Sequence, residues 1–584
     1  MQSSNFKFMI AILGSLIAAY GLQSCTALEK AAATSQQQEK LPITEDRSDH
    51  HASSKKTNYL TCEEKEDAPR LMNLGNHTFP VSTQNQQAQL YINQGLNLSY
   101  GFNHEEAGRA FREAARLDPE LAMAYWGQAL VLGPNINADM EKDHELQAQQ
   151  LIQQAKQLMQ HASPRELALI EALEKRYSGH AQQRKTNDKA YAQAMRKVHQ
   201  LFPDDQDIAT LYVESVMDLS PWGYWMPDGT PHEGIAEVVA LTEKVLQDNP
   251  LHPGALHMYI HLMESTKTPE KAEQAADTLL HLVPEAGHLV HMTAHIYQNI
   301  GRYADSIKSN QMAIAVDENY ISQCHEKGHY PVLYYPHNIH FLWYAATADG
   351  QSKLAIESAR KAANMIDEKT LQEIPLTAIF RVAPYWALVR FGLWQEILAE
   401  PAPQTDNLFI HGSWHYIRGL ALVATDQIQQ AEQELEELRK NTQALIADDI
   451  VISKNNASSI LNIAVEVLTG EIAFARAQFD QAILHLDKAV RLEDALQYTE
   501  PAEFQLPPRL ALGAMLLTIG RAEEAETVYW EDLKHNRDNG WALFGLMQAL
   551  TAQNKHERAA IIKTRFAKAW QRADIKLTRS RFGR

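Results

Sequence analysis

Five histidines recur at helical spacing in the middle of the chain. His257 and His261 are four residues apart, and His288, His291 and His295 follow at intervals of three and four. Side chains separated by three, four or seven residues lie on one face of an α-helix. Each run therefore predicts a stripe of imidazoles along one helix.

The two stripes share a register. His257 and His291 are 34 residues apart, and so are His261 and His295. A period of 34 residues is the length of one tetratricopeptide unit, a pair of antiparallel helices. The first helices of successive units are neighbours in such a stack, with these positions facing its concave groove. We therefore expect the histidines to form one patch in the groove.

Further candidates extend this patch. His337 and His340 are three residues apart where the first helix of the next unit begins. Glu214 takes the repeat position of His261 and His295 in the unit that precedes them. Imidazole with carboxylate suits Zn, Fe, Mn or Cu. The predicted metal ligands are His257, His261, His288, His291, His295, His337, His340 and Glu214. Two alternatives stay open: a neutral polar groove for an organic ligand or peptide, and histidines that only stabilise the fold. Metal binding needs neutral imidazoles, so we expect affinity to fall below about pH 6.

A second set of polar and aromatic residues belongs to the first repeats. Trp126 is seven residues after Pro119, which predicts a groove-facing ring. Asn135 and Asn137 follow a helix end, and His104 lies at the turn of the first repeat. The four are candidate groove ligands, although helix capping and packing are the favoured explanation for them.

Small residues and prolines recur at tetratricopeptide offsets and define the elements that must carry these side chains. The matching sets are Gly95, Ala107, Phe111, Ala114 and Pro119; Trp343, Ala355, Ala359 and Ala362; Gly419, Ala431, Leu435 and Leu438; Gly470, Ala482, Leu486 and Ala489; and Gly513, Ala525 and Tyr529. The predicted fold is all-α, a tetratricopeptide-repeat superhelix or α-solenoid. Aromatic, proline-rich stretches at 219–235 and 320–336 predict two irregular insertions, a kind of loop that is often functional.

The beginning of the chain has the layout of an export signal. Lys7 precedes an apolar run, and Leu22-Gln23-Ser24-Cys25 resembles a lipoprotein cleavage site, although Gln23 is off-pattern. We expect lipidation at Cys25, with ordinary signal-peptidase cleavage as the alternative, and a location on the periplasmic side as an outer-membrane lipoprotein. The predicted segments are 1–24 signal peptide, 25–70 flexible tether, 71–318 N-terminal repeat array, 319–340 aromatic and histidine insertion, and 341–584 C-terminal repeat array.

Charge and cysteine content restrict the partners. The formal net charge is -18, with 72 acidic and 54 basic residues, which repels nucleic-acid backbones. We expect a protein or peptide partner, no nucleic acid, and membrane contact only through the lipid anchor. Cys62 and Cys324 could pair in an oxidising compartment, but their spacing gives no local reason for it.

Several long phrases resemble a group of bacterial, often exported, histidine-containing tetratricopeptide proteins without an assigned reaction. The phrases are FNHEEA (102–107), AMAYWGQALVLGPNIN (122–137), LHMYIH (256–261), AGHLVHMTAHIYQNIGRY (286–303), YPHNIHF (335–341) and NGWALFGL (539–546). Thr293 departs from this pattern, where Pro is expected. The resemblance covers residue 72 to the end and implies the fold and a histidine-lined centre, but no reaction.

Two functions follow as hypotheses. In the first, the chain is an exported scaffold whose groove binds a partner and holds a metal ion. In the second, it is a metal-dependent enzyme of unknown reaction, with Glu214 as the first candidate for a general base. The sequence contains no Walker A loop, dinucleotide-binding glycine motif, Gly-x-Ser-x-Gly elbow or His-Glu-x-x-His motif.

Overall fold

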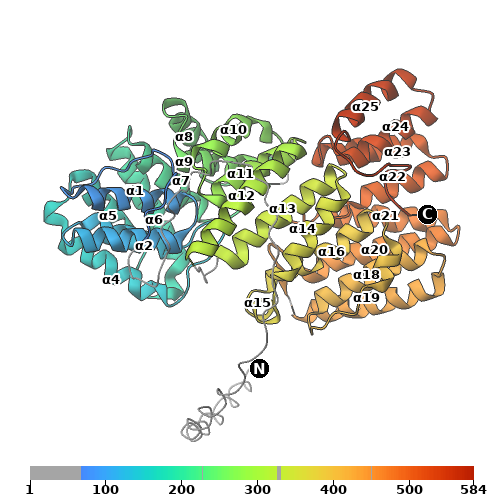
Figure 1. Cartoon of the computed structure of the whole chain (residues 1–584), viewed down its shortest axis with the longest axis horizontal. Coiled ribbons are helices and arrows are strands. Elements are labelled where there is room, and N and C mark those ends of the chain that lie inside the picture. Colours follow the sequence, from blue (N-terminus) through green and yellow to red (C-terminus); the bar gives the residue numbers. More distant parts are fainter. Residues whose placement is uncertain (1–67, 227, 325–329, 449, 584) are drawn as a thin grey trace, which may run out of the picture. The chain divides into compact units, whose positions relative to one another are not determined.

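The computed structural model describes residues 68–226, 228–324, 330–448 and 450–583. Over these ranges the chain forms 25 α-helices and one two-stranded hairpin (Figure 1), which confirms the all-α prediction. The predicted signal peptide, most of the tether, Cys25 and Cys62 lie outside the described residues, as does the side chain of Cys324.

Helices of the first third form successive antiparallel pairs. They are α1 (Gln86–Tyr100), α2 (His104–Leu117), α3 (Ala122–Val131), α4 (His144–Gln157), α5 (Pro164–Glu174), α6 (Arg184–Leu201), α7 (Gln206–Met217) and α8 (Ile235–Asp248). Several begin at side-chain caps, because a polar side chain there accepts from otherwise unpaired backbone N–H groups. Asn85, for example, accepts from the backbone of Gln87 and Ala88 at the start of α1.

The central helices carry the histidine stripes. They are α9 (Pro253–Glu264), α10 (Glu273–Leu282), α11 (Gly287–Asn299), α12 (Tyr303–Cys324), α13 (Tyr335–Ala348) and α14 (Ser352–Asn364). A π-helical turn, Tyr330–Tyr334, precedes α13. Helix α11 contacts both α9 and α13, so the first helices of successive pairs are neighbours, as the repeat period predicts.

The remaining helices complete the repeat array. They are α15 (Glu368–Glu373), α16 (Ala378–Arg390), α17 (Trp394–Ala399), α18 (Leu408–Ala424), α19 (Ile428–Asp448), α20 (Ala457–Ala475), α21 (Phe479–Asp494), α22 (Pro508–Thr518), α23 (Ala522–His535), α24 (Gly540–Ala552) and α25 (His556–Ala569). The strands Val451–Ile452 and Asn455–Asn456 pair in antiparallel fashion before α20.

Glycines pack against an aromatic ring in two distant repeats. A Cβ atom on Gly95 would lie 2.7 Å from the Phe111 ring, and one on Gly127 would lie 2.4 Å from it. The Tyr529 ring meets Gly513 and Gly545 in the same way, at 2.5 and 2.2 Å. Any larger residue would push these helices apart. The contacts confirm the small and aromatic positions of the predicted tetratricopeptide repeat.

The irregular segments differ in part from the prediction. Residues 218–234 separate α7 from α8, close to the predicted insertion. The second insertion is shorter than predicted, because α12 continues to Cys324 and α13 begins at Tyr335. No Gly or Pro interrupts 303–324, so nothing ends that helix earlier. A third irregular segment, 495–507, joins α21 to α22 and was not predicted.

One described helix is long and apolar enough to cross a membrane. This helix is α20, but 78% of its apolar window is buried against the rest of the protein. Its apolar residues, among them Leu461 and Leu468, belong to the core of the repeat array. The helix therefore has the environment of a core helix.

Two large apolar cores fill the array. The first is built from residues between 68 and 297, and the second from residues between 307 and 562. Apolar neighbours of the histidines on α9 and α11 belong to the first core, and those on α13 belong to the second. The histidine stripes thus lie where the two cores meet.

Candidate metal centre

Six histidines form two groups of three. His257 and His261 of α9 meet His288 of α11, and their nearest ring nitrogens all lie within 4.8 Å of one another. The second group consists of His291 and His295 of α11 with His337 of α13, within the same distance. We call these groups the first and the second triad. Both are of a size that could hold a metal ion.

The grouping is diagonal with respect to the expected register. Equal repeat positions paired His257 with His291 and His261 with His295. In the structure His288 completes the first triad, and His261 and His295 are neighbours across the triads, with ring centroids 5.9 Å apart. Helix α11 therefore serves both triads, one from its first turn and the other from the following turns.

Hydrogen bonds fix the tautomers of four of these rings. Nδ1 of His257 donates to the backbone carbonyl of Tyr100 at 2.6 Å, a group that can only accept. Nδ1 of His291 donates to Asn310 Oδ1 at 2.7 Å, while the amide nitrogen of Asn310 donates to a backbone carbonyl. A neutral imidazole protonated at Nδ1 carries its lone pair on Nε2.

The carboxylate of Glu264 fixes the Nδ1 protons of the other two rings, those of His261 and His295. Glu264 accepts from Nδ1 of His261 at 2.8 Å and from Nδ1 of His295 at 2.5 Å. It thereby ties the first triad to the second. Holding Nδ1 with an acceptor while Nε2 points elsewhere is the arrangement that metal-binding histidines use in proteins.

The Nε2 atoms of the first triad lack protein partners. Within the described part of the chain, Nε2 of His257, Nε2 of His261 and both ring nitrogens of His288 are buried without a hydrogen bond. Leaving a buried polar atom unpaired costs about 1–3 kcal/mol. An ion bound between the three rings would satisfy these atoms together.

In the second triad two Nε2 atoms face each other. Those of His291 and His295 are 2.9 Å apart. Two nitrogen ligands at about 2.0–2.1 Å from a tetrahedral ion lie about 3.3 Å apart. The observed pair is close to that spacing, and a proton on one ring holds the pair together without an ion.

Burial controls the charge on the triads. It lowers the pKa of His257, His261, His288, His291 and His337 well below the usual value, and the positive charge of neighbouring rings lowers it further. These five imidazoles are neutral at pH 7, the form that binds metal.

His295 is the exception. Burial opposes its charge, but the carboxylates of Glu264 and Glu500 outweigh burial and raise its pKa to about 10. Glu500 Oε2 lies 2.7 Å from Nδ1 of His295. Burial, followed by the charge of Glu264, raises the pKa of Glu500 to about 7. Two buried carboxyl groups next to the second triad favour a cation there.

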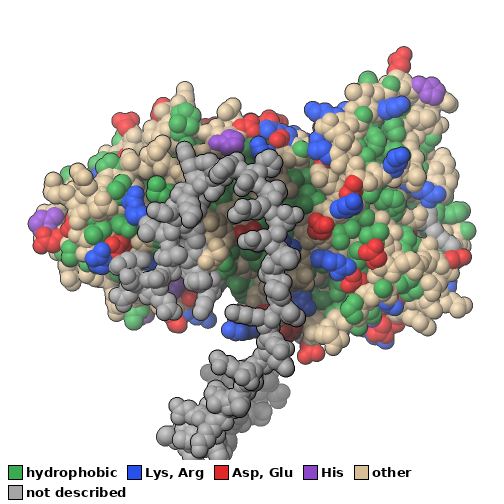
Figure 2. Space-filling view, in the orientation of Figure 1, with side chains coloured by type: hydrophobic (Ala, Val, Ile, Leu, Met, Phe, Trp, Pro, Cys, Tyr) green, Lys and Arg blue, Asp and Glu red, His purple; other side chains and the backbone are tan. Residues whose placement is uncertain are grey.

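Five of the six triad histidines are buried, and His337 is half-buried. The five on α9 and α11 expose 2% of their surface or less. The histidines visible on the face shown in Figure 2 lie scattered and form no patch there. Trp222, from the first irregular segment, packs on His261 with ring centroids 5.3 Å apart. Tyr334, from the turn before α13, packs on His288 at 4.7 Å. The segments singled out as insertions thus cover the histidines that the groove was expected to expose.

A buried aspartate holds the helices around His288. Asp317 of α12 accepts from the Tyr330 hydroxyl at 2.9 Å and from Asn338 at 2.7 Å. The Tyr330 hydroxyl in turn accepts from the backbone N–H of His288. A Cβ atom at Gly287 would lie 1.9 Å from Asp317 Oδ1, so only glycine fits there. The network ties α11, α12 and α13 together beside both triads.

A third group of possible ligands has a different character. Asp207 accepts from Nε2 of His77 and from the Tyr100 hydroxyl, each at 2.8 Å. Nδ1 of His252 accepts from the backbone N–H of Ala255, which leaves the proton of the neutral ring on Nε2, 3.3 Å from Asp207. Nε2 of His252 forms no hydrogen bond within the described residues, so Asp207 is held by His77 and Tyr100, and His252 lies beside it.

Two predicted ligands lie outside the triads. Nε2 of His340 accepts from the Gln505 amide at 2.8 Å, and its ring stacks on Trp343. Glu214 of α7 is close enough to Asp218 for the two charges to interact, and burial followed by that repulsion raises the pKa of Glu214 to about 8. The structure groups neither residue with the six histidines.

The predicted groove residues of the first repeats have structural surroundings. Trp126 is buried and stacks on Phe79. Asn135 Oδ1 accepts from the backbone of residues 137 and 138 and stabilises their turn. Burial lowers the pKa of His104 to about 4. Asn137 contacts a residue that covers the triads, because its Oδ1 accepts from the indole N–H of Trp222.

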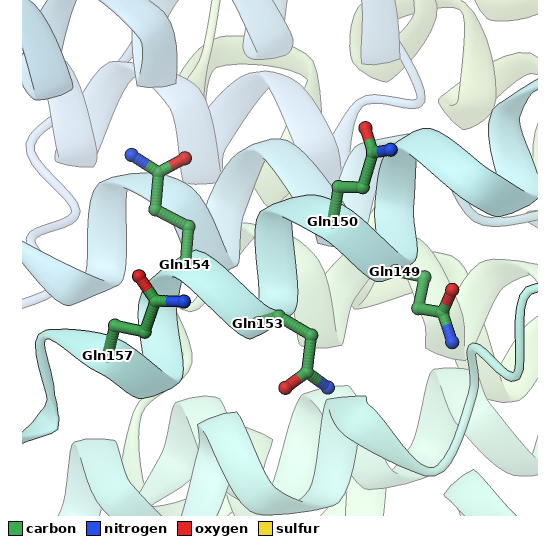
Figure 3. Close-up of a pocket in the computed structure, with 5 residues that line it drawn as sticks. All are labelled: Gln149, Gln150, Gln153, Gln154 and Gln157. Atoms are coloured by element: carbon green, nitrogen blue, oxygen red, sulfur yellow. The ribbon is translucent and has the colours of Figure 1, made fainter.

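A surface hollow on α4 has no such chemistry. Five glutamines line it (Figure 3), and none of them titrates: Gln149, Gln150, Gln153, Gln154 and Gln157. Uncharged amides on a solvent-facing helix give no basis for metal binding or catalysis. The chemistry of the described chain is concentrated at the triads.

Several functional side chains escaped the sequence analysis. Glu264 lies three residues after His261, a helical spacing that could have revealed it. Glu500 and Asn310 could not be found from local spacing, because Glu500 is more than 200 residues from its partner His295. Phe102 belongs to a phrase that was noted, but its contact with the first triad was not expected.

Comparison with known proteins adds no argument to what the structure itself shows. No protein-family model and no curated protein matches the sequence. Among solved structures, human IFIT1 dimer with m7Gppp-AAAA is 12% identical and covers 83% of this chain and 90% of that chain, with a TM-score of 0.32. Yeast Tom70 is 11% identical and covers 82% and 90%, with a TM-score of 0.27. Values this low carry no argument about what the chain binds. The fold and the buried triads define a tetratricopeptide-type repeat protein with a polyhistidine centre.

Proposed function

We propose that the chain is a tetratricopeptide-type scaffold that binds a transition metal through the two histidine triads. The observation that carries this proposal is the set of buried Nε2 atoms whose rings are fixed by acceptors at Nδ1. Core histidines without a ligand role normally have partners on both sides, as His340 shows for Nε2. Zn, Fe, Mn and Cu are the candidate ions, and an imidazole set with carboxylates held outside it favours Zn and Cu.

The surroundings support the charge of an ion. Glu264 and Glu500 place two carboxyl groups beside the second triad, in contact with Nδ1 of His295 rather than with Nε2. A carboxylate behind a ligating histidine raises the basicity of the ring and orients it. The same groups compensate the positive charge that a buried ion brings.

A second function is a metal-dependent enzyme. Glu500 favours it, because a buried carboxyl group with a pKa of about 7 can take up or release a proton near neutral pH. Under this hypothesis Glu500 would hold or release a proton beside the second triad, and the carboxyl pair would act on a bound ion through Nδ1 of His295. Replacing Glu500 with Gln would abolish turnover but retain metal, whereas a pure scaffold would show no turnover to lose.

Export and partner binding complete the proposal. The apolar run and the Leu22-Gln23-Ser24-Cys25 stretch support a lipoprotein on the periplasmic side of the membrane. A repeat scaffold commonly binds a segment of another protein. Mass spectrometry of the mature chain, compared between Cys25 and Cys25→Ala forms, tests the lipid anchor directly.

The decisive experiment is metal analysis of the full chain without a histidine tag. We expect bound metal as isolated, and a higher melting temperature when Zn, Cu, Fe or Mn is added back after chelation. The combined variant His257→Ala, His261→Ala, His291→Ala and His295→Ala should bind none, while His340→Ala, a matched buried histidine outside the triads, should bind as the natural chain does. Absence of metal together with no effect of any added ion on melting would refute the proposal.

A further inference from the structure

We infer that the centre is dinuclear, with one ion in each triad and a single bridging oxygen ligand, such as hydroxide, between them. This inference rests on the proposed metal function and makes it more specific. One tetrahedral ion accepts four ligands at most, whereas six imidazoles converge here. The question is whether the six behave as one site or as two.

The sharing of α11 separates the two sites. His288 lies beside His257, with ring centroids 5.1 Å apart, whereas His291 lies beside His337 at 4.8 Å. The ring centroids of His288 and His291, both on α11, are 5.9 Å apart. One helix therefore sends consecutive histidines to different neighbours, α9 for the first triad and α13 for the second.

Each triad has its own aromatic wall. The Phe102 ring contacts all three histidines of the first triad, with centroid distances of 4.5, 6.0 and 5.6 Å to His257, His261 and His288. Phe102 and Phe341 are both buried. Because the Phe102 ring contacts every histidine of the first triad, these three histidines share one local environment.

Phe341 has the same role on the other side. Its ring lies 4.8, 4.5 and 5.0 Å from His291, His295 and His337. The two phenylalanines come from distant parts of the sequence, the turn before α2 and helix α13. The two triads are thus similarly built compartments that contact each other between His261 and His295.

The two compartments offer separate sets of ring nitrogens. An ion between His291 and His295 would leave Nε2 of His257, Nε2 of His261 and both nitrogens of His288 unpartnered. An ion in the first triad would leave the Nε2 atoms of His291 and His295 sharing a proton at 2.9 Å. A second ion would replace that proton, so two ions give every one of these nitrogens except one of His288 a metal partner.

Glu264, which connects the two triads, is compatible with a pair of metal ions. Glu264 bridges them from outside, since one oxygen holds His261 and the other holds His295. Each ion has three imidazoles and one remaining position. In dinuclear sites of enzymes the ions lie about 3.5–4 Å apart and share a ligand. The rings of His261 and His295, one from each triad, have centroids 5.9 Å apart, so the two sites adjoin, and a single oxygen ligand would fill the remaining position of both ions.

Copper titration of the full-length, tag-free protein tests the pair. After chelation we expect two Cu(II) ions per chain and an electron paramagnetic resonance signal that integrates to far fewer than two spins, because a shared hydroxide couples the ions. A single ion per chain, or two ions with the full signal of isolated copper, would overturn the dinuclear assignment. No copper at all would instead refute the metal function itself.

Variants in each triad sharpen the result. His257→Ala should lower the copper-to-chain ratio from two to one, and His337→Ala should do the same, each leaving a full one-spin signal. His340→Ala is the matched control and should retain two coupled ions. Loss of both ions in both triad variants, with folding verified by circular dichroism, would show one shared site. If a triad variant does not fold, the stoichiometry and spin count of the natural chain still decide.

Discussion

The centre of the array and its C-terminal end use the same helix pairs for different purposes. Between α22 and α24 the ring of Tyr529 is buried against two glycines, and its hydroxyl is hydrogen-bonded to Ser580 at 2.7 Å. Between α9 and α11 the interface instead holds imidazoles with unpartnered nitrogens. A repeat needs only shape complementarity to stack, so the polar, unsatisfied interface marks the place where stacking alone does not explain the residues.

The largest expected effect is a loss of stability in the C-terminal repeats. Tyr529→Ala removes a fully buried ring, and we expect the free energy of unfolding to fall by about 3–5 kcal/mol. Urea denaturation measures it. Tyr529→Phe, which loses only the bond to Ser580, should cost about 1 kcal/mol. Metal affinity should not change in either variant; a large change would show that the two regions are not independent.

Removing a ligand should act on the centre alone. His291→Ala should weaken metal binding by at least about 100-fold, the upper end of the effect of losing an outer-sphere partner. Competition with a chromophoric chelator gives the affinity. His340→Ala should leave the affinity unchanged. Equal losses in the two variants would mean that the measured metal is not held by the triads.

An outer-sphere change should have an intermediate effect. Glu264→Gln replaces the carboxylate that holds Nδ1 of both His261 and His295, and we expect metal affinity to fall by about 10–100-fold. Glu503→Gln is the matched control, because Glu503 is equally buried but bonds Asn455 in another part of the chain. An unchanged metal affinity in Glu264→Gln would show that the carboxylate of Glu264 does not contribute to metal binding.

The smallest effect concerns pH and a histidine outside the triads. Burial lowers the pKa of His340 to about 3, so below pH 6.5 the unfolded chain binds a proton that the folded chain does not. The metal-free protein must then lose stability as the pH falls from 6.5 towards 3. In His340→Gln the slope should be smaller by up to about 1.4 kcal/mol per pH unit, measured by urea denaturation at pH 6 and pH 5. Identical slopes would contradict the buried, neutral state of His340.

The same shifts revise the expected pH dependence of metal binding. From unperturbed values the affinity was expected to fall below about pH 6. Because burial lowers the pKa of His257, His261 and His288 well below the usual value, protonation of the first triad competes with the ion only at lower pH. The first triad should therefore keep its ion into more acidic solution than exposed histidines would.

Periodicity made the fold and most of the triads predictable. The 34-residue offset identified neighbouring first helices, and helical spacing identified which histidines share a face. The diagonal grouping was not predictable, because the relative shift of α9 and α11 depends on how side chains along both helices pack. The burial of the site was missed for a similar reason, since Trp222 and Tyr334 come from irregular segments whose path has no sequence period.

X-ray absorption spectroscopy of the metal-loaded, full-length protein tests the central claim most directly. We predict a first shell with three imidazole nitrogens per ion at about 2.0–2.1 Å, which disappears when the histidines of both triads are replaced. A first shell dominated by oxygen or sulphur would contradict the assignment of the ion to the histidine triads.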